Sequence, residues 1–142
     1  MTGKPFVDTN ILIYAHDLDA GKKHEQARDL IGGLWKAGGG VLSTQVLQEF
    51  YVNLTRKIPQ PISPAVARNL ITLYRTWQVE INTVDTLLRA SEYQERNQLS
   101  FWDAMIVASA VQGGATELLT EDLNAGQLIQ GVRVVNPFEG GN

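Results

Sequence analysis

The stretch KPFVDTNILIYAHD, from Lys4 to Asp17, joins a short strand to a helix through a single acidic residue. Phe6 and Val7 are strand formers behind a proline, and the apolar run that resumes at Ile11 has the length of a helix. Asp8 stands at the change between the two elements. It either caps the helix, because aspartate is a favoured N-cap residue, or it faces a positively charged group beyond the end of the strand.

Short strands and helices continue to alternate along the rest of the chain. We expect further strands at 41–42, 77–84, 116–120 and 132–135, and helices at 22–36, 46–56, 63–77, 85–98 and 100–112. This order is typical of an α/β domain in which a mostly parallel sheet lies between helical layers. In such sheets, ligands bind beyond the carboxyl ends of the strands.

Glycine and proline mark the ends of several of these elements. The run AGGG at 37–40 is typical of a helix C-terminus, because glycine is favoured just past the last turn. Ser63 followed by Pro64 is a strong helix start. In the helix that follows, the residues expected to face the core are Val66, Leu70, Leu73 and Trp77.

The bulk composition predicts one soluble globular domain over residues 1–142, with a loose tail from about 137 to 142. Hydrophobic residues make up 44% and charged residues 19% of the chain, as in ordinary globular proteins. No apolar run approaches the ~20 residues of a membrane span, and no secretory leader is evident. Because cysteine is absent, disulfides and thiolate chemistry are excluded, and we expect a cytoplasmic protein.

The formal net charge of -3 taken alone argues against a nucleic-acid partner. The chain has 15 acidic and 12 basic residues. If four carboxylates are metal ligands, 11 acidic residues remain against the 12 basic ones. The overall charge is therefore compatible with RNA binding and does not decide for or against it.

Two carboxylates follow predicted strands. Asp8 comes directly after Phe6 and Val7, and Asp122 comes just past the strand at 116–120. Each also has a plain structural explanation, since aspartate commonly caps a helix or opens a turn. Two aspartates at strand ends are harder to explain in this way than one.

Two further carboxylates lie on predicted helices. Glu49 shares a helix face with Val46, where an unpaired charge is costly, unless the side chain tilts into solvent. Asp103 is in the first turn of an almost entirely apolar helix. Ser100 and Asp103 have the spacing of a capping box, so Asp103 either stabilises the helix start, serves a site, or does both.

Four motifs carry these acids, in the order FVDTNILIYAHD, STQVLQEFY, LSFWDAMIVASA and LLTEDLNAGQ. Together they resemble the PIN-domain ribonucleases, and most of all the VapC-type toxins of bacterial toxin–antitoxin pairs. The resemblance covers nearly the whole chain. It implies a PIN-like, Rossmann-like three-layer sandwich with a mostly parallel central sheet flanked by helices.

The resemblance also implies the site and its chemistry. Its catalytic and metal-binding residues would be Asp8, Glu49, Asp103 and Asp122, with Thr9, Asn10 and Thr120 as supporting polar residues. The expected cofactor is Mg²⁺ or Mn²⁺, and the expected activity is metal-dependent endoribonucleolytic hydrolysis of RNA. Glu121 beside Asp122 leaves open which of the two points inward, and we favour Asp122 for its spacing from the strand.

Partners follow from the resemblance as well. VapC-type toxins bind a cognate antitoxin and commonly form homodimers, and we expect both here, with no membrane contact. The alternative is a catalytically inactive PIN-like module that binds RNA or a partner. For Trp102 we expect core packing in preference to base stacking. Candidate contacts to the RNA backbone are Lys22, Lys23, Arg56, Lys57 and Arg96.

Overall fold

A six-stranded sheet in the order β3-β2-β1-β4-β6-β5 forms the centre of the molecule. The structure is a computed structural model and describes residues 3–139. The strands are β1 (Phe6–Val7), β2 (Val41–Ser43), β3 (Gln78–Glu80), β4 (Glu117–Leu119), β5 (Leu128–Ile129) and β6 (Val132–Val135). In this part of the chain every strand pairing is parallel except that of β5 with β6.

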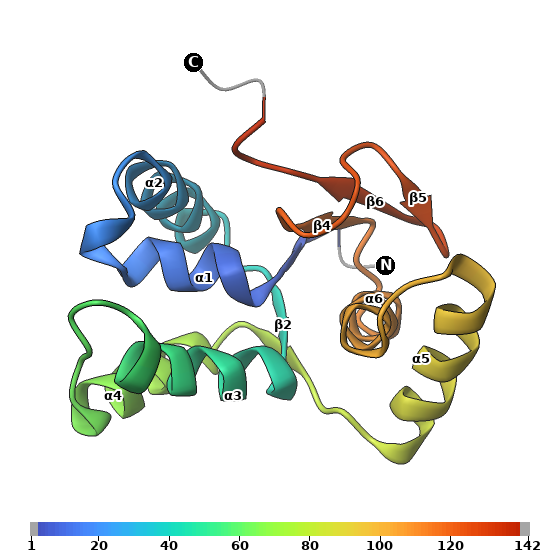
Figure 1. Cartoon of the computed structure of the whole chain (residues 1–142), viewed down its shortest axis with the longest axis horizontal. Helices are drawn as coiled ribbons and strands as arrows, with labels where there is room; N and C mark the ends of the chain where they lie inside the picture. The colour runs from blue at the N-terminus through green and yellow to red at the C-terminus, as the bar shows by residue number, and fades with distance from the viewer. Residues whose placement is uncertain (1–2, 140–142) are drawn as a thin grey trace.

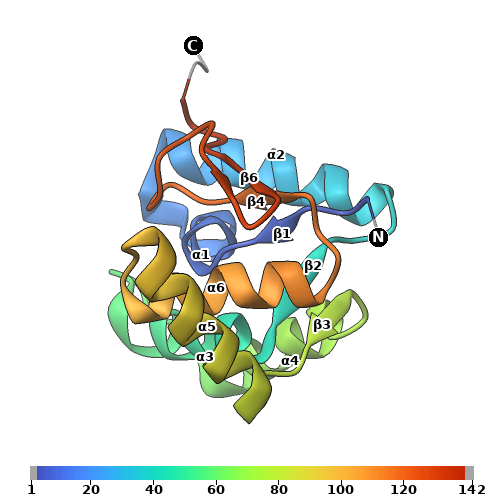
Figure 2. The same ribbon diagram turned by 90° about the vertical axis from the view of Figure 1, so that its right-hand side faces the viewer.

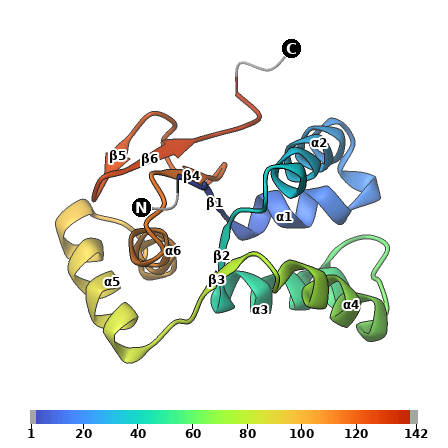
Figure 3. The ribbon, with the colours of Figure 1, turned by 180° about the vertical axis from the view of Figure 1, so that it is seen from behind.

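Helices cover both faces of the sheet. They are α1 (Thr9–His16), α2 (Lys22–Lys36), α3 (Thr44–Val52), α4 (Pro64–Tyr74), α5 (Val84–Asn97) and α6 (Phe101–Gln112). In Figure 1, β1, β2 and β4 lie between α1 and α2 on one side and α5 and α6 on the other. Figure 2 shows α5 and α6 in front of the sheet, and Figure 3 shows the same layers from behind. The predicted α/β three-layer sandwich is confirmed.

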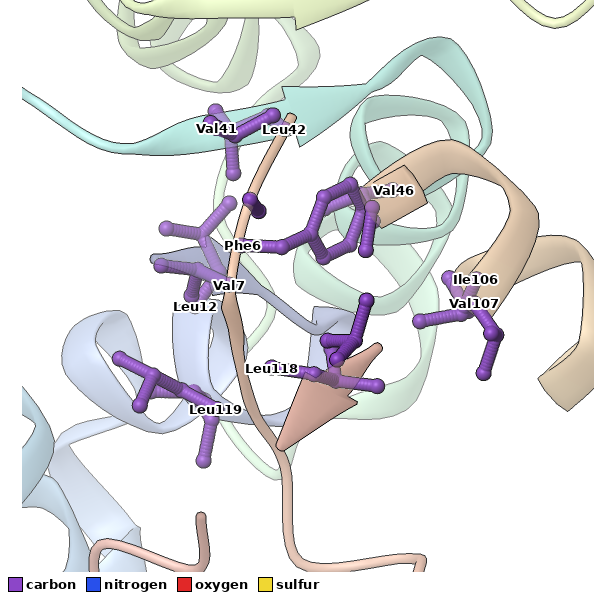
Figure 4. Close-up of a cluster of buried hydrophobic side chains, with 14 of the residues drawn as sticks. Phe6, Val7, Leu12, Val41, Leu42, Val46, Ile106, Val107, Leu118 and Leu119 are labelled. Carbon is purple, nitrogen blue, oxygen red and sulfur yellow. The ribbon is translucent and has the colours of Figure 1, made fainter. Parts of the chain in front are cut away.

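The central strand β1 anchors the core on both sides. Phe6 and Val7 are fully buried, and successive strand residues face opposite sides of a sheet. Figure 4 shows Phe6 extending toward Val46 and Val7 extending toward Leu12. Because β1 pairs in parallel with β2 and β4, the residue that follows Val7 lies at the carboxyl edge of the sheet with neighbours on both sides.

Several elements differ in extent from the sequence prediction. The strand expected at 77–84 is limited to β3, and β5 was not predicted. The helix expected at 46–56 begins at Thr44 and continues beyond Val52 as a π-helical segment, Asn53–Lys57. Single π-helical turns are found mostly inside helices and often at functional sites. No helix among residues 3–139 combines the length and apolar character that a membrane crossing requires.

The prediction for the inward face of α4 was partly wrong. Val66 and Leu73 are 48% and 57% exposed, whereas Ala67 and Tyr74 are buried. Trp77 is buried as expected, but it lies beyond the helix end. The rings of Tyr74 and Trp77 pack edge to face with centroids 5.2 Å apart. Because aromatic rings bury the largest areas, this contact sets the rotation of α4 and turns Val66 and Leu73 outward.

The chain end is described only as far as Glu139, so residues 140–142 of the expected tail lie outside the described residues. Within the described part of that tail, Phe138 is half-buried and its ring meets the ring of Tyr14 edge to face at 5.5 Å.

The turn after α2 allows a matched test of packing. Gly38 and Gly39 have φ values of 97° and 96°, but only at Gly39 would an added Cβ meet the Trp77 ring, at 2.8 Å from Cδ1. We expect Gly38→Ala to cost about 1–2 kcal/mol through backbone strain alone. Gly39→Ala should cost about 1–3 kcal/mol more, because the indole must move. Urea denaturation of both variants measures the difference, and equal losses would contradict it.

Candidate functional site

A pocket of about 210 Å³ lies at the carboxyl edge of the sheet and gathers acidic side chains from four segments. It is lined by Asp8, Thr9, Asn10, Ile13, Gln45, Glu49, Asn53, Trp102, Asp103, Ile106 and Asp122. The four predicted acids therefore meet in one place, together with two of the three predicted supporting residues. The third, Thr120, lies behind the pocket in direct contact with Asp8.

Asp8 is buried at the end of β1 and both of its carboxylate oxygens accept hydrogen bonds. Oδ1 accepts from the backbone N–H of Thr9 at 2.7 Å, and Oδ2 accepts from the Thr120 hydroxyl at 2.8 Å. Asp8 is also the N-cap residue of α1. The structure thus confirms the cap, and it also places Asp8 at the pocket, so the two explanations left open by the sequence do not exclude each other.

Burial governs the proton affinity of Asp8. Desolvation raises the pKa of Asp8 to about 7, and the nearby carboxylates of Asp122 and Glu49 add to the increase. The hydrogen bonds from Thr120 and Thr9 act in the opposite direction because they stabilise the ionised form. Near neutral pH, the Asp8 carboxyl is therefore partly protonated.

Neighbouring polar residues hold two of the other acids. The Thr9 hydroxyl donates to Oε1 of Glu49 at 2.6 Å, and the side-chain amide of Asn10 donates to Oδ2 of Asp122 at 2.8 Å. Thr9 and Asn10 follow Asp8 directly, so the first turn of α1 orients carboxylates from two distant segments. This is a specific structural role for the pair that the sequence predicted as supporting residues.

Glu121 and Asp122 point to different partners. Lys23 Nζ donates to Oε2 of Glu121 at 2.7 Å, and the Tyr14 hydroxyl donates to its Oε1. Partial burial acts to raise the pKa of Glu121, but these two hydrogen bonds outweigh it and lower the pKa. Asp122 turns into the pocket, where burial and the charges of Asp103 and Glu121 raise its pKa. The geometry favours Asp122, as predicted from its spacing.

Asp103 lies in the first turn of α6, whose N-cap is Ser100. The Ser100 hydroxyl accepts from the backbone N–H of Asp103 at 3.1 Å. The Asp103 side chain lines the pocket, so it sits at a helix start, where negative charge is favourable, and at the site. The spacing that suggested a cap therefore does not compete with a role in the site.

The sequence analysis did not assign three polar or aromatic residues to the pocket: Gln45, Asn53 and Trp102. Gln45 and Asn53 lie four residues before and after Glu49 on one continuous helical run, so the three share a face. That spacing was a usable signal. Trp102 is 63% exposed and lines the pocket, so the expectation of core packing was wrong. Its neighbours from Ala104 to Ala110 fill the buried side of α6, and position 102 lies on the remaining open face.

The donor set suits a hard divalent cation that keeps part of its water shell. Among residues 3–139, no group of three or more histidine, aspartate or glutamate side chains is arranged to hold a metal ion by itself. Thr9, Asn10 and Thr120 each donate a hydrogen bond to one of the carboxylates. Mg²⁺ is typically bound through one or two carboxylates and several waters, so the oxygen-rich pocket fits it in that form.

Comparison with known proteins agrees with this geometry. The family model of the PIN domain matches residues 6–128, which contain all four pocket acids. The chain belongs to the PIN-domain family. The similarity of its sequence to VapC-type toxins is matched by its structural neighbours, so that prediction is confirmed. Among curated proteins, no relative matches the sequence.

Three solved structures show the same PIN fold. VapC20 of Mycobacterium tuberculosis, described as a toxin that cleaves the sarcin–ricin loop, is 27% identical with a TM-score of 0.65, over 90% of this chain and 98% of its own. A toxin–antitoxin complex from Klebsiella pneumoniae is 23% identical with a TM-score of 0.69, over 95% and 98%. DNA-bound VapBC from Salmonella typhimurium is 18% identical with a TM-score of 0.63, over 92% and 96%. The last two identities support the fold alone.

The buried carboxylate of Asp8 predicts how stability depends on pH when metal is removed. Its folded pKa of about 7 exceeds its ordinary value of 3.8, so between these pH values the folded protein holds a proton that the unfolded chain releases. In chelator, this one carboxyl should therefore lower the free energy of unfolding as pH rises across the window, by about 4 kcal/mol, and its contribution should level off above pH 7.

Asp8→Asn removes this contribution. We expect the variant to lose less stability than the wild type between pH 4 and pH 8, as measured by chemical denaturation in EDTA. Burial lowers the pKa of His16, which contributes an opposite slope, but that contribution is common to both proteins and cancels in the difference. Asp29→Asn, at an exposed position, is the control and should follow the wild type. Parallel profiles for wild type and Asp8→Asn would contradict the assignment.

Proposed function

We propose that this PIN domain is a metal-dependent endoribonuclease and acts as the toxin of a type II toxin–antitoxin pair. The observation that supports this most is the convergence of Asp8, Glu49, Asp103 and Asp122 on one pocket. The 27% identical VapC20 is described as cleaving the sarcin–ricin loop, which supports RNA as the substrate class here. An inactive binding module would not require four carboxylates at mutual electrostatic cost.

Mg²⁺ or Mn²⁺ is the cofactor in this proposal. Asp8 and Asp103 would bind it directly, and Glu49 and Asp122 would bind it directly or through water. When bound, the cation would lower the pKa of a coordinated water and neutralise charge that develops on the phosphate. No protein side chain is then needed as a general base.

The chain's own residues keep the acids in place for this task. Thr120 and the backbone of Thr9 hold both oxygens of Asp8, while the Thr9 hydroxyl holds one oxygen of Glu49. In each case at least one lone pair remains free, since a carboxylate oxygen accepts more than one hydrogen bond. The acids are thereby oriented before any ligand binds, which lowers the ordering cost of binding.

The rim of the pocket offers contacts for a single-stranded nucleic acid. The exposed indole of Trp102 is held edge to face against Phe101, with ring centroids 5.1 Å apart, and it stands next to Asp103. An exposed aromatic ring beside a phosphodiester site can stack a base. Among the basic candidates, Lys23 is engaged by Glu121, whereas Arg56 and Lys57 are exposed at the end of the run that carries Glu49.

Two protein partners belong to the proposal, a cognate antitoxin and a second copy of the chain. Two of the structural neighbours are a toxin–antitoxin complex and a VapBC complex. Val52 on α3 is exposed and lines a groove of about 460 Å³ together with Leu47, Tyr51 and Ile71, and Val66 and Leu73 on α4 are exposed as well. Exposed apolar surface of this kind is typical of protein contacts.

Cleavage of a mixed RNA pool tests the central proposal. Wild-type protein should cut RNA with Mg²⁺ or Mn²⁺ and lose activity in EDTA. Asp8→Asn and Asp103→Asn should each reduce the rate by roughly 100-fold or more, as losses of groups that stabilise a transition state do. Asp29→Asn controls for a general effect of removing one negative charge. Rates are measured from labelled RNA under single-turnover conditions.

Each alternative predicts a different result. Metal-independent binding of RNA without cutting would favour the inactive module. Equal cutting by wild type and Asp8→Asn would remove the proposed mechanism. Cutting of DNA of the same sequence at the same rate would leave the chemistry intact and widen the substrate class to nucleic acids in general.

The role of Trp102 has its own test. Trp102→Ala should raise KM for RNA by roughly 10-fold, because stacking of one base contributes about 1–3 kcal/mol, and should leave kcat nearly unchanged. Trp102→Phe retains a ring and should recover most of the loss. Since the side chain is largely exposed, neither change should lower folding stability much. A drop in stability with an unchanged KM would instead indicate a packing role.

A further inference from the structure

Two amide oxygens in the pocket lack any hydrogen-bond donor. Buried polar atoms without a partner are rare in folded proteins, and each needs a physical cause. Among residues 3–139 these side-chain atoms are Asn10 Oδ1, Gln45 Oε1 and Trp77 Nε1. Two of the three belong to residues that line the acidic pocket, and both of these are acceptors. The unmet hydrogen bonding of this part of the chain is thus concentrated at one site.

Gln45 is the clearer case because the residue is buried, with only 7% of its surface exposed. Its backbone N–H is satisfied by the side-chain oxygen of Asn82 at 2.9 Å, so the start of α3 does not need the Gln45 side chain. Nor does Gln45 act as the helix cap, since Ser43 fills that position. The Gln45 carboxamide therefore has no evident part in folding, and its unpaired oxygen costs stability.

The surroundings determine what can supply the missing donor. Neither amide oxygen has a hydrogen-bond partner among the four acids of the pocket, and carboxylates in the ionised form accept hydrogen bonds but donate none. The pocket as a whole holds acceptors in excess and negative charge in excess. A cation that carries hydrogen-bond donors would both neutralise the negative charge and pair with the free acceptors. A hydrated divalent cation does so, because the hydrogens of its waters all point outward.

We propose that Gln45 and Asn10 are positioning residues that accept hydrogen bonds from the hydration waters of a divalent cation in this pocket. The carboxylates supply few direct ligands, in keeping with the lack of a three-ligand group, and the two amides hold the remaining water shell. Asn10 has a second function, because its Nδ2 orients Asp122. This inference rests on the proposed function, since it concerns the cation expected at the same site.

Gln45→Met tests the inference without RNA. Methionine has a similar length and no acceptor of comparable strength. Such outer-shell partners usually contribute 10–100-fold to metal affinity. We expect the Kd for Mn²⁺ and Mg²⁺, measured by calorimetric titration, to rise by 10-fold or more. In EDTA the melting temperature of the variant should equal or exceed that of the wild type, because a buried unpaired acceptor has been removed.

Two further variants make the result specific. Gln48→Met changes an exposed glutamine one turn along the same helix and should leave both Kd and melting temperature unchanged. Gln45→Glu keeps an acceptor oxygen, so it should bind Mn²⁺ at least as tightly as the wild type at pH 8. In EDTA it should melt at a lower temperature, because it adds a charge in a pocket that already holds four carboxylates.

The outcomes separate this inference from the proposed function. If the wild type binds neither cation, the proposed metal-dependent activity fails together with the inference. If the wild type binds and Gln45→Met binds equally well, only the inference is overturned. A variant that loses metal affinity and EDTA stability together would show a structural role for Gln45 and would also overturn it.

Discussion

The Thr120 hydroxyl joins the ends of two neighbouring strands, and the arrangement of the acids depends on it. Fully buried, it donates to Asp8 and accepts from the backbone N–H of Asp122 at 3.1 Å. A hydroxyl can do both at once, which neither a methyl nor an amide hydrogen could. Because Val7 is paired with Leu119 in the parallel sheet, the residues just beyond them come together at the same edge. The register of β1 against β4 therefore determines where Asp8 and Thr120 lie relative to each other.

This arrangement sets stability against function at a single carboxylate. Asp8 is buried behind Phe6 and Val7, in a place where its charge is poorly solvated. Hydrogen bonds from Thr9 and Thr120 recover part of the desolvation cost but not all of it, since the pKa stays raised. The apolar core on both sides of β1 compensates for the rest. A site that is unfavourable when empty binds a compensating cation more strongly, because binding relieves the same repulsion.

Much of the fold could be predicted because its signals are local. The helix at Lys22–Lys36 was predicted to the residue from its periodicity and the glycine run that follows it, and the starts at Pro64 and Phe101 were predicted from their serine caps. For Asp8 and Asp103 the sequence left a choice between cap and site. The structure shows why no choice was needed: in a parallel sheet the helix that follows a strand begins at the edge where ligands bind.

The remaining features depend on contacts between distant segments. The sequence favoured Asp122 over Glu121 only from its distance to the strand. The contacts that hold Glu121 elsewhere come from Lys23 and Tyr14, which lie 98 and 107 residues away in the chain, and no spacing rule predicts them. The exposure of Trp102 was missed for a related reason. A helix that is apolar nearly all round has no polar stripe to mark its outer face, so periodicity cannot tell which large side chain is left uncovered.

Gln45, Glu49 and Asn53 form a polar stripe along α3 and the π-helical segment that follows it, and all three line the pocket. Counting carboxylates finds Glu49 but passes over Gln45 and Asn53, which occupy the same helix face one turn to either side. Counting donors and acceptors brings all three into one set. Glu49 and Asp122 each accept a hydrogen bond from a protein donor. The distinguishing feature of the pocket is that the amide oxygens of Asn10 and Gln45 have no hydrogen-bond donor among the described residues. This surplus of acceptors, more than the net charge of the protein, describes the ligand: cationic, rich in hydrogen-bond donors and small enough for a pocket of about 210 Å³.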